Sequence, residues 1–294
     1  MWFRLLFRQL KIMDTRKICT LLRNAIDAEI AAAGLDVGSS DAVKLVERGP
    51  YLLVLVLSGA LSPPHHGHTK MLKVAGVMAE KQGGENKWKF VGGLLSPSSG
   101  DYVASKLGAD AIKERYRNLM CELVTEEDEP QIAVAPLGIA NGDFLCATIL
   151  DQLKSEAKAG SLAHALPAYF PWNRLRILPV YGTDFMLRAP FVVNGPRVIA
   201  TRNDDDGSTE LAARFLAEGT KGYVHPDFLF LTLPDGAVPS FSSTAVRNAL
   251  KDIINETEDP ARRQRAQRFL DKALHPKVLS LLQSVDHEEL HERR

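Results

Sequence analysis

The chain has 294 residues, a formal net charge of zero and three cysteines. This length suits one large α/β domain with additions, or two small domains, and is ample to bury a core. Equal numbers of basic and acidic residues, 36 of each, argue against a general nucleic-acid or membrane-surface binder, which would carry a basic excess. The cysteines are scattered and form no CxxC pair, which argues against a disulfide scaffold or a cysteine zinc site and fits a reducing compartment.

The first segment, MWFRLLFRQLKIM at residues 1–13, is apolar and basic and contains no acid. It is interpreted either as a mitochondrial transit signal or, because its last residue is a second methionine, Met13, that precedes DTRKICTLL, as an extension of the gene model. After it, apolar residues at spacings of three and four predict an amphipathic helix over residues 15–33. No apolar run approaches the length of a membrane-spanning helix.

The most convincing strand is YLLVLVL at residues 51–57. It shows no alternation, and Ser-Gly and Pro-Pro follow it, so the pattern predicts a strand buried on both faces. A helical stretch over residues 68–82 comes next, then a strand over residues 89–96 with a glycine pair. The residues after this strand, SPSSGDY, are expected to form a loop.

Helices and strands alternate through the rest of the chain. The pattern predicts helices over 108–124 and 143–159, strands over 131–135, 174–180, 197–201 and 228–233, and helices from 242 to 290 with breaks at Asp259-Pro260 and His275-Pro276. Such alternation predicts βαβ units and a mostly parallel sheet with right-handed crossovers. Because ligands bind outside the carboxyl ends of the strands in these sheets, the loops that follow the strands are the places to search.

The motifs that are missing narrow the chemistry. The sequence contains no GxxxxGK[ST], no GxGxxG and no GxSxG. Their absence argues against a P-loop phosphotransferase, a dinucleotide oxidoreductase of the usual type and an α/β-hydrolase.

The segment SGALSPPHHGHTKML at residues 58–72 stands out, directly after the strongest strand. His65 and His68 lie at the start of the following helix, and Gly67 between them permits close approach of the backbone to a ligand. A helix N-terminus is a ready anion site. Imidazoles there can donate hydrogen bonds to phosphate oxygens, and as cations they would neutralise charge that develops on phosphate.

A second segment, FSSTAVR at residues 241–247, follows the last predicted strand and opens a helix. Ser242 or Ser243 can cap that helix. The same residues also form a candidate phosphate cradle, in which hydroxyl groups and helix N–H groups combine with the forked guanidinium of Arg247. SSTxxR alone is a weak signal, but paired with HxGH after the first strand it is strong.

With these two segments, the sequence resembles the HxGH nucleotidyltransferase superfamily, and most of all the nicotinamide mononucleotide adenylyltransferases, as a divergent fungal-type member. The resemblance covers roughly residues 50–255. SGALSPPHHGH corresponds to that family's GSFNPxTxxH, and LLSPSSGDY with the later RNLMCEL resembles ISPVxDxY…RxxMxEL. YGTDF resembles its GADLL loop, and VIATR with SFSSTAVRNAL resembles its strand ending in arginine and its ISSTxIRxxL helix.

The resemblance implies an α/β Rossmann-like nucleotidyltransferase fold, a mostly parallel sheet with helices on both faces and a helical C-terminal extension. The expected division is a leader or gene-model extension (1–13), an N-terminal helix and linker (14–49), the nucleotidyltransferase domain (50–285) and a polar tail (286–294).

The activity that it implies is adenylyl transfer from ATP to nicotinamide mononucleotide, giving NAD and pyrophosphate by direct in-line attack without a covalent enzyme intermediate. Mg²⁺ would enter on the ATP phosphates rather than in a protein cage. Catalytic roles fall on His68, His65 and Arg247. The implied ATP-binding residues are Ser58, Gly59, Ala60, His65, His68, Arg202, Ser242, Ser243, Thr244 and Arg247. The implied mononucleotide-binding residues are Ser96, Pro97, Tyr102, Lys106, Arg117, Gly182 and Asp184.

Three departures from the family pattern bear on the substrate. Ala60 and Ser62 replace a serine and an asparagine, and the family's lysine two positions after its tyrosine is replaced by Ala104, with Lys106 two further on. The family stacks the pyridine ring on a tryptophan after the third strand, where this chain has APLG at residues 135–138. Phe144 and Trp172 are the candidate replacements.

Two alternatives stay open. One keeps the fold but changes the phosphate acceptor, as in cytidylyltransferases or phosphopantetheine adenylyltransferases. The other is a catalytically weak relative that acts as a chaperone or binding module. The expected partners are ATP and nicotinamide or nicotinic acid mononucleotide, with no nucleic acid and no membrane, and a homo-oligomer stays open. We expect a cytoplasmic or nuclear location, or a mitochondrial one if residues 1–13 are a transit signal.

Overall fold

The computed structural model describes residues 15–82, 87–126, 131–162, 165–182, 195–202, 227–254 and 259–291. The predictions for the leader at residues 1–13 and for Asp184 lie outside the described residues. None of the described helices is both long and apolar enough to cross a membrane.

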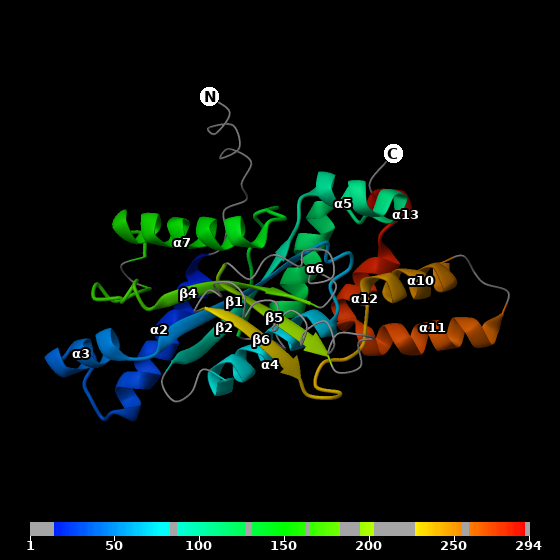
Figure 1. The fold of residues 1–294 in the computed structure, drawn as a ribbon. Coiled ribbons are helices and arrows are strands. Elements are labelled where there is room, and N and C mark those ends of the chain that lie inside the picture. The colour runs from blue at the N-terminus through cyan, green and yellow to red at the C-terminus, as the bar shows by residue number, and fades with distance from the viewer. Residues whose placement is uncertain are drawn as a thin grey trace.

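A six-stranded parallel sheet forms the centre of the molecule (Figure 1). Its strands are β1 (Tyr51–Gly59), β2 (Trp88–Pro97), β3 (Ile132–Val134), β4 (Leu175–Tyr181), β5 (Arg197–Arg202) and β6 (Phe228–Leu233). Their spatial order is β3-β2-β1-β4-β5-β6, and every neighbouring pair is parallel. This is the doubly wound order of Rossmann-like folds, in which the chain changes direction between the first and fourth strands. The predicted α/β fold is confirmed.

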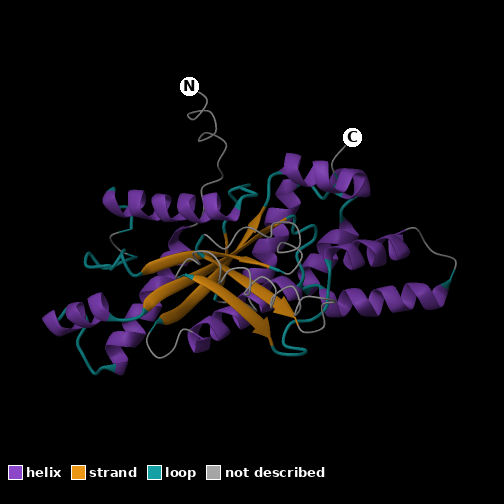
Figure 2. Cartoon of the chain, viewed as in Figure 1, coloured by secondary structure: helices purple, strands orange, loops and turns teal. Residues whose placement is uncertain are grey.

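Strand β1 is buried on both faces, as its unbroken apolar run predicts. Leu52, Val54 and Val56 belong to a core cluster with helices α2 (Thr15–Ala32), α3 (Ser40–Arg48) and α7 (Gly142–Lys158). Leu53, Leu55 and Leu57 point to the other face and pack with α4 (His66–Gln82). Alternate side chains of β1 therefore pack against helices on both faces of the sheet. Figure 2 shows helices on either side of the strands.

A third core cluster lies beside the sheet and is formed mainly by helices. It joins α6 (Glu114–Glu126) to α10 (Ser243–Ile254), α11 (Pro260–Ala273), α12 (Pro276–Ser284) and α13 (His287–Leu290). The predicted breaks are confirmed. Asp259 caps the N-terminus of α11 and His275 that of α12, and the first residue of each helix is a proline. Proline suits the first helical position, where its missing N–H costs nothing.

Some elements differ from the predictions. Helix α3 is not predicted; Ser39 caps it by accepting a hydrogen bond from the Ala42 N–H at 3.2 Å. The loop expected at SPSSGDY contains the start of α5 (Gly100–Leu107), capped by Ser99. Residues 108–110 form a 3₁₀ turn, so the helix predicted from residue 108 begins at Glu114 instead. Helices α3 and α5, of nine and eight residues, are shorter than the stretch over which apolar periodicity is read, which is why periodicity misses them.

The residues expected to form a polar tail are also partly structured. His287–Leu290 make up α13, and Leu290 is only 3% exposed in the helical cluster. One apolar side chain in an otherwise charged stretch therefore anchors this segment to the molecule.

Candidate functional site

A cavity of about 670 Å³ opens at the carboxyl ends of β1 and β4. Its lining comes from the loop after β1, the N-terminal ends of α4, α7 and α10, residues of α5 between Tyr102 and Leu107, the end of β4 and the start of β5. The cavity lies at the carboxyl ends of the strands, beside the point between β1 and β4 where the strand order reverses. Doubly wound folds bind ligands at this position.

The two predicted histidines lie together on this cavity. The Nδ1 atom of His68 accepts a hydrogen bond from the backbone N–H of His65 at 3.1 Å, and the two rings stack with centroids 3.7 Å apart. A Cβ added to Gly67 would lie 2.9 Å from Nδ1 of His65. The glycine between the histidines is thus needed for the packing of His65, which is a steric reason for the HxGH spacing.

Burial lowers the pKa of His68 to about 4. In the free protein the ring is therefore neutral near pH 7. Because Nδ1 accepts a hydrogen bond, the ring proton resides on Nε2. His68 then offers a neutral N–H donor to the cavity, rather than the cation that the sequence also allowed.

The start of α10 is bonded directly to the loop after β1. The Ser243 hydroxyl donates to the carbonyl of Pro63 at 3.1 Å, and Arg247 donates through Nη1 to the carbonyl of Ser62 at 2.8 Å. Nη2 of Arg247 also donates to the Thr244 hydroxyl at 3.1 Å. Ser242 caps the helix by accepting from the Ala245 N–H, as predicted. We call His65, His68, Ser243, Thr244 and Arg247, all of which line the cavity, the α4–α10 wall.

The other predicted ATP-binding residues lie at the same edge of the sheet. Ser58, Gly59 and Ala60 line the cavity, and the Ser58 hydroxyl donates to the carbonyl of Ile139 at 3.0 Å. Arg202 is the last residue of β5, in register with Leu233 of β6, and its side chain lies outside the description.

The predicted mononucleotide residues divide into two groups. Tyr102, Lys106 and Gly182 line the cavity. Ser96 and Pro97 are buried at the end of β2 and do not line it; the Ser96 hydroxyl instead donates to the carbonyl of Ala135 at 2.7 Å.

Arg117 requires a correction, because its side chain is fully buried and does not line the cavity. Its Nη1 donates to the carbonyls of Ala60 at 3.0 Å and Ser98 at 2.8 Å, and its Nε donates to the carbonyl of Ile112 at 2.8 Å. A guanidinium taken out of water needs such acceptors. Arg117 thus supports the cavity wall from behind.

The expected replacements for the stacking tryptophan are not on the cavity. Trp172 packs against Phe170 and the core cluster of α2 and α7, and Phe144 is 59% exposed on α7 without lining the cavity. The aromatic side chains that do line it, among the described residues, are Tyr102, Tyr181 and Phe241.

Sequence reasoning missed the opposite side of the cavity. We call its residues, Asn141, Gly142, Asp143, Tyr181 and Arg197, the α7 wall. Nη2 of Arg197 pairs with Asp143 at 2.8 Å, and a Cβ on Gly142 would collide with the Tyr181 hydroxyl. Burial, with a contribution from Asp143, raises the pKa of Tyr181 to about 12. The sequence signal that could have indicated this side of the cavity is Asn141. It follows the third strand and caps the N-terminus of α7 by accepting a hydrogen bond from the Phe144 N–H.

One further sequence pattern, HEELH at residues 287–291, matches the letters of the HExxH zinc motif. That motif needs both histidines on one helical face, but α13 ends at Leu290 and His291 pairs with Ile112 in a β-bridge. Among the described residues, no group of three or more His, Cys, Asp or Glu side chains is placed to hold a metal ion.

No protein-family model matches the chain, and no curated protein matches it. Among solved structures, it is similar to the nicotinic acid mononucleotide adenylyltransferase of Plasmodium falciparum complexed with APC, and to the same enzyme complexed with NaAD. Each similarity covers 78% of this chain, and 92% and 94% of those chains, with 12% sequence identity and a TM-score of 0.41. Likeness at this level assigns neither a family nor a substrate.

Proposed function

We propose that this chain transfers an adenylyl group from ATP to nicotinamide mononucleotide, giving NAD and pyrophosphate. The observation that carries the proposal is the joining of two candidate phosphate-binding segments in one cavity. Ser243 and Arg247 bond to Pro63 and Ser62 across 180 and 185 residues of chain. The HxGH histidines and the SSTxxR segment thus form one surface of donors, as a triphosphate requires.

In this proposal the α4–α10 wall holds the triphosphate. The Nε2–H of His68, the Thr244 hydroxyl and the Arg247 guanidinium donate to its oxygens. An oxygen of the mononucleotide phosphate attacks the α-phosphorus, and the bond to the leaving pyrophosphate breaks in line. The wall supports this step by positioning the triphosphate and stabilising charge on the leaving oxygens.

Magnesium fits this arrangement as a companion of ATP. Asp143 is the one carboxylate that lines the cavity within the described ranges, and it is already paired with Arg197. The described residues thus offer no carboxylate cage here, and Mg²⁺ held by phosphate oxygens and water would supply charge neutralisation.

For the acceptor, the proposal uses Tyr102 and Lys106 of α5. They are four residues apart, so they share one helical face, and both line the cavity. Lys106 supplies a cation for the mononucleotide phosphate, and the ring of Tyr102 supplies an aromatic surface for a base. Gly182, at the end of β4, leaves room for a ribose.

A second candidate keeps adenylyl or cytidylyl transfer but changes the acceptor. It is favoured by one observation, that no tryptophan lines the cavity among the described residues. A phosphopantetheine or another phosphate acceptor would not need the stacking partner that a pyridine ring uses.

The test is direct. Purified protein is incubated with ATP, Mg²⁺ and either nicotinamide or nicotinic acid mononucleotide, and dinucleotide and pyrophosphate are measured. We expect both products, and none when the mononucleotide is omitted. Failure to form dinucleotide with either acceptor overturns the proposal. Parallel reactions with CTP and with phosphopantetheine test the second candidate, and ATP binding without any turnover would identify a binding module.

A further inference from the structure

Residues 110–117, which we call the hub segment, are bonded to the backbone of the cavity wall from behind. The Ser62 hydroxyl accepts a hydrogen bond from the Ile112 N–H at 3.2 Å. Arg117 reaches the carbonyls of Ala60 and Ser98, which belong to the loops after β1 and β2. One short segment therefore fixes the loops that follow two neighbouring strands.

The hub segment is also tied to α10. Lys251 pairs with Asp110 at 2.8 Å. Ser62 is held from both sides, because its hydroxyl accepts from Ile112 while its carbonyl accepts from Arg247. This explains how a serine serves at a position where the related motif has asparagine: its short side chain links the loop to the hub segment.

Behind the hub segment lies a second layer, residues 286–291, which we call the clasp. The Lys113 N–H donates to the carbonyl of Leu290 at 2.9 Å, and Ile112 forms an antiparallel bridge with His291. Leu290 is buried in the same cluster as Ile112. The clasp thus adds a short β-pairing and one apolar anchor to the side of the hub segment that faces away from the cavity.

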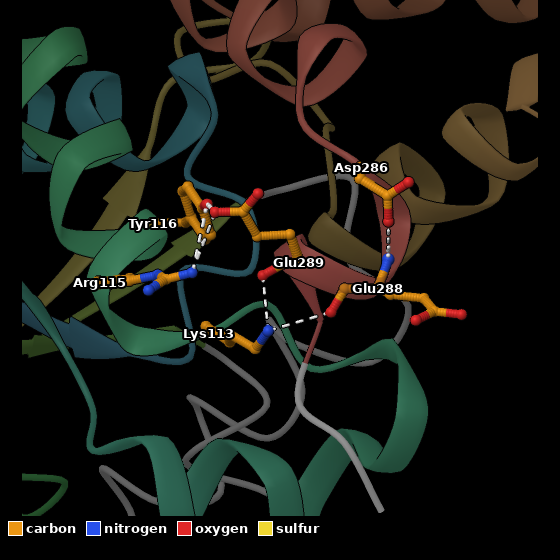
Figure 3. Close-up of polar contacts among 6 residues, drawn as sticks. All are labelled: Lys113, Arg115, Tyr116, Asp286, Glu288 and Glu289. Carbon is orange, nitrogen blue, oxygen red and sulfur yellow. Dashed lines mark hydrogen bonds and ion pairs between the residues drawn. The ribbon is translucent and has the colours of Figure 1, made fainter.

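Polar side chains reinforce this contact (Figure 3). Nζ of Lys113 donates to the carbonyls of Glu288 at 3.0 Å and Glu289 at 2.7 Å. The Glu289 carboxylate accepts from the Tyr116 hydroxyl at 2.5 Å and from Arg115 at 3.2 Å. The Arg115 and Glu289 side chains are largely exposed, so the backbone bonds and Leu290 contribute more than this ion pair.

We propose that Arg117 and the clasp are positioning elements for the loop at residues 59–65. The proposal rests on the proposed function in that this loop would hold ATP. Arg117 suits the role because a guanidinium fork reaches carbonyls of two loops at once, which a lysine ammonium does not reproduce. The clasp suits a positioning role because it contacts the hub segment, while none of its residues lines the cavity.

The test compares Arg117→Lys and Leu290→Ala with Leu22→Ala, all in the full chain. Leu22 is a matched control, since it is equally buried but lies on α2, which contributes nothing to the cavity lining. Amide hydrogen exchange is measured in the loop at residues 59–65 of the ligand-free protein, together with KM for ATP and for the acceptor.

For Arg117→Lys and Leu290→Ala we expect loop exchange to accelerate about tenfold, as local opening becomes easier. The KM for ATP should rise several-fold, with the acceptor KM within about twofold. Leu22→Ala should lower the melting temperature without either change. Unaltered loop exchange in both test variants, or equal acceleration in the control, overturns the proposal. If Leu290→Ala does not fold, Lys113→Met takes its place. If the wild-type protein makes no dinucleotide, the proposed function fails, while the exchange data still decide the positioning role.

Discussion

The two walls of the cavity differ in their hydrogen-bonding groups and in how their charges are paired. The α4–α10 wall consists mainly of donors, and its residues are held by backbone contacts such as those of Arg247 with Ser62 and His68 with His65. The α7 wall pairs its own charges, since Asp143 meets Arg197 at 2.8 Å. The α4–α10 wall therefore presents donors that suit an anion, whereas the charges of Asp143 and Arg197 on the α7 wall neutralise each other. Under the proposed function, charge chemistry belongs to the first wall and the second shapes the space beside it.

Among substitutions that distinguish the two walls, His68→Ala on the α4–α10 wall is expected to reduce activity most. Removing a preorganised donor to developing charge typically costs about 10²–10³ in kcat. We expect a loss of that size, with circular dichroism and melting temperature close to those of the wild-type protein. Wild-type turnover by a properly folded variant would remove His68 from the mechanism.

A smaller loss is expected from Arg247→Ala. A hydrogen bond to a charged group contributes about 1.5–3 kcal/mol, so kcat/KM for ATP should fall roughly 10- to 100-fold. The control is Arg265→Ala, because Arg265 lies on α11 with its side chain 64% exposed and outside the cavity. Steady-state kinetics at varied ATP measure the effect. Equal kinetic constants for Arg247→Ala and the control would contradict a phosphate role.

On the α7 wall, Asp143→Asn should affect stability more than ATP use. It leaves the Arg197 side chain, which is 4% exposed, without its carboxylate partner. Because the Asp143 side chain is 46% exposed, solvent screens the pair and the cost is about 1 kcal/mol. That lowers the melting temperature by about 2–4 °C in a chain of this size. Calorimetry measures the shift, and the KM for ATP should stay within about twofold. A large rise in that KM would show that both walls hold the triphosphate.

A further effect, which needs no ligand, is a pH dependence of stability from His68. Its pKa is about 4 in the folded protein, against an ordinary value of 6.5. As the pH falls from 6.5 to 4, the unfolded chain binds a proton at this residue before the folded one does. Stability present at neutral pH is therefore lost across this window. Melting temperatures from pH 7 to 4.5 should fall more steeply for the wild-type protein than for His68→Asn. Parallel curves would contradict a lowered pKa for His68 in the folded protein.

The sequence predicts elements whose signal is local. The YLLVLVL run marks β1, and a proline after Asp259 and after His275 marks the helix breaks. The two motif segments likewise indicate residues that the structure brings to one cavity. In each case neighbouring residues carry both the pattern and its physical cause.

The same reasoning fails where the cause lies far along the chain. Arg117 occupies a motif position, which suggests contact with substrate, but its acceptors are carbonyls of residues 60, 98 and 112. Arg197 lies just before the VIATR match and is not part of any motif, although it lines the cavity and pairs with Asp143. Contacts between residues that lie far apart in the chain cannot be read from the local sequence pattern around either residue.

The bond between Arg247 and Ser62 has a consequence for biosynthesis. At translation rates of about 5–20 residues per second, the 185 residues between the two take roughly 10–40 s to add. Throughout that interval the nascent chain holds its histidine loop without the arginine that completes the wall. Under the proposed function, nucleotide binding at full strength therefore requires that Arg247 has been synthesised and has left the ribosome.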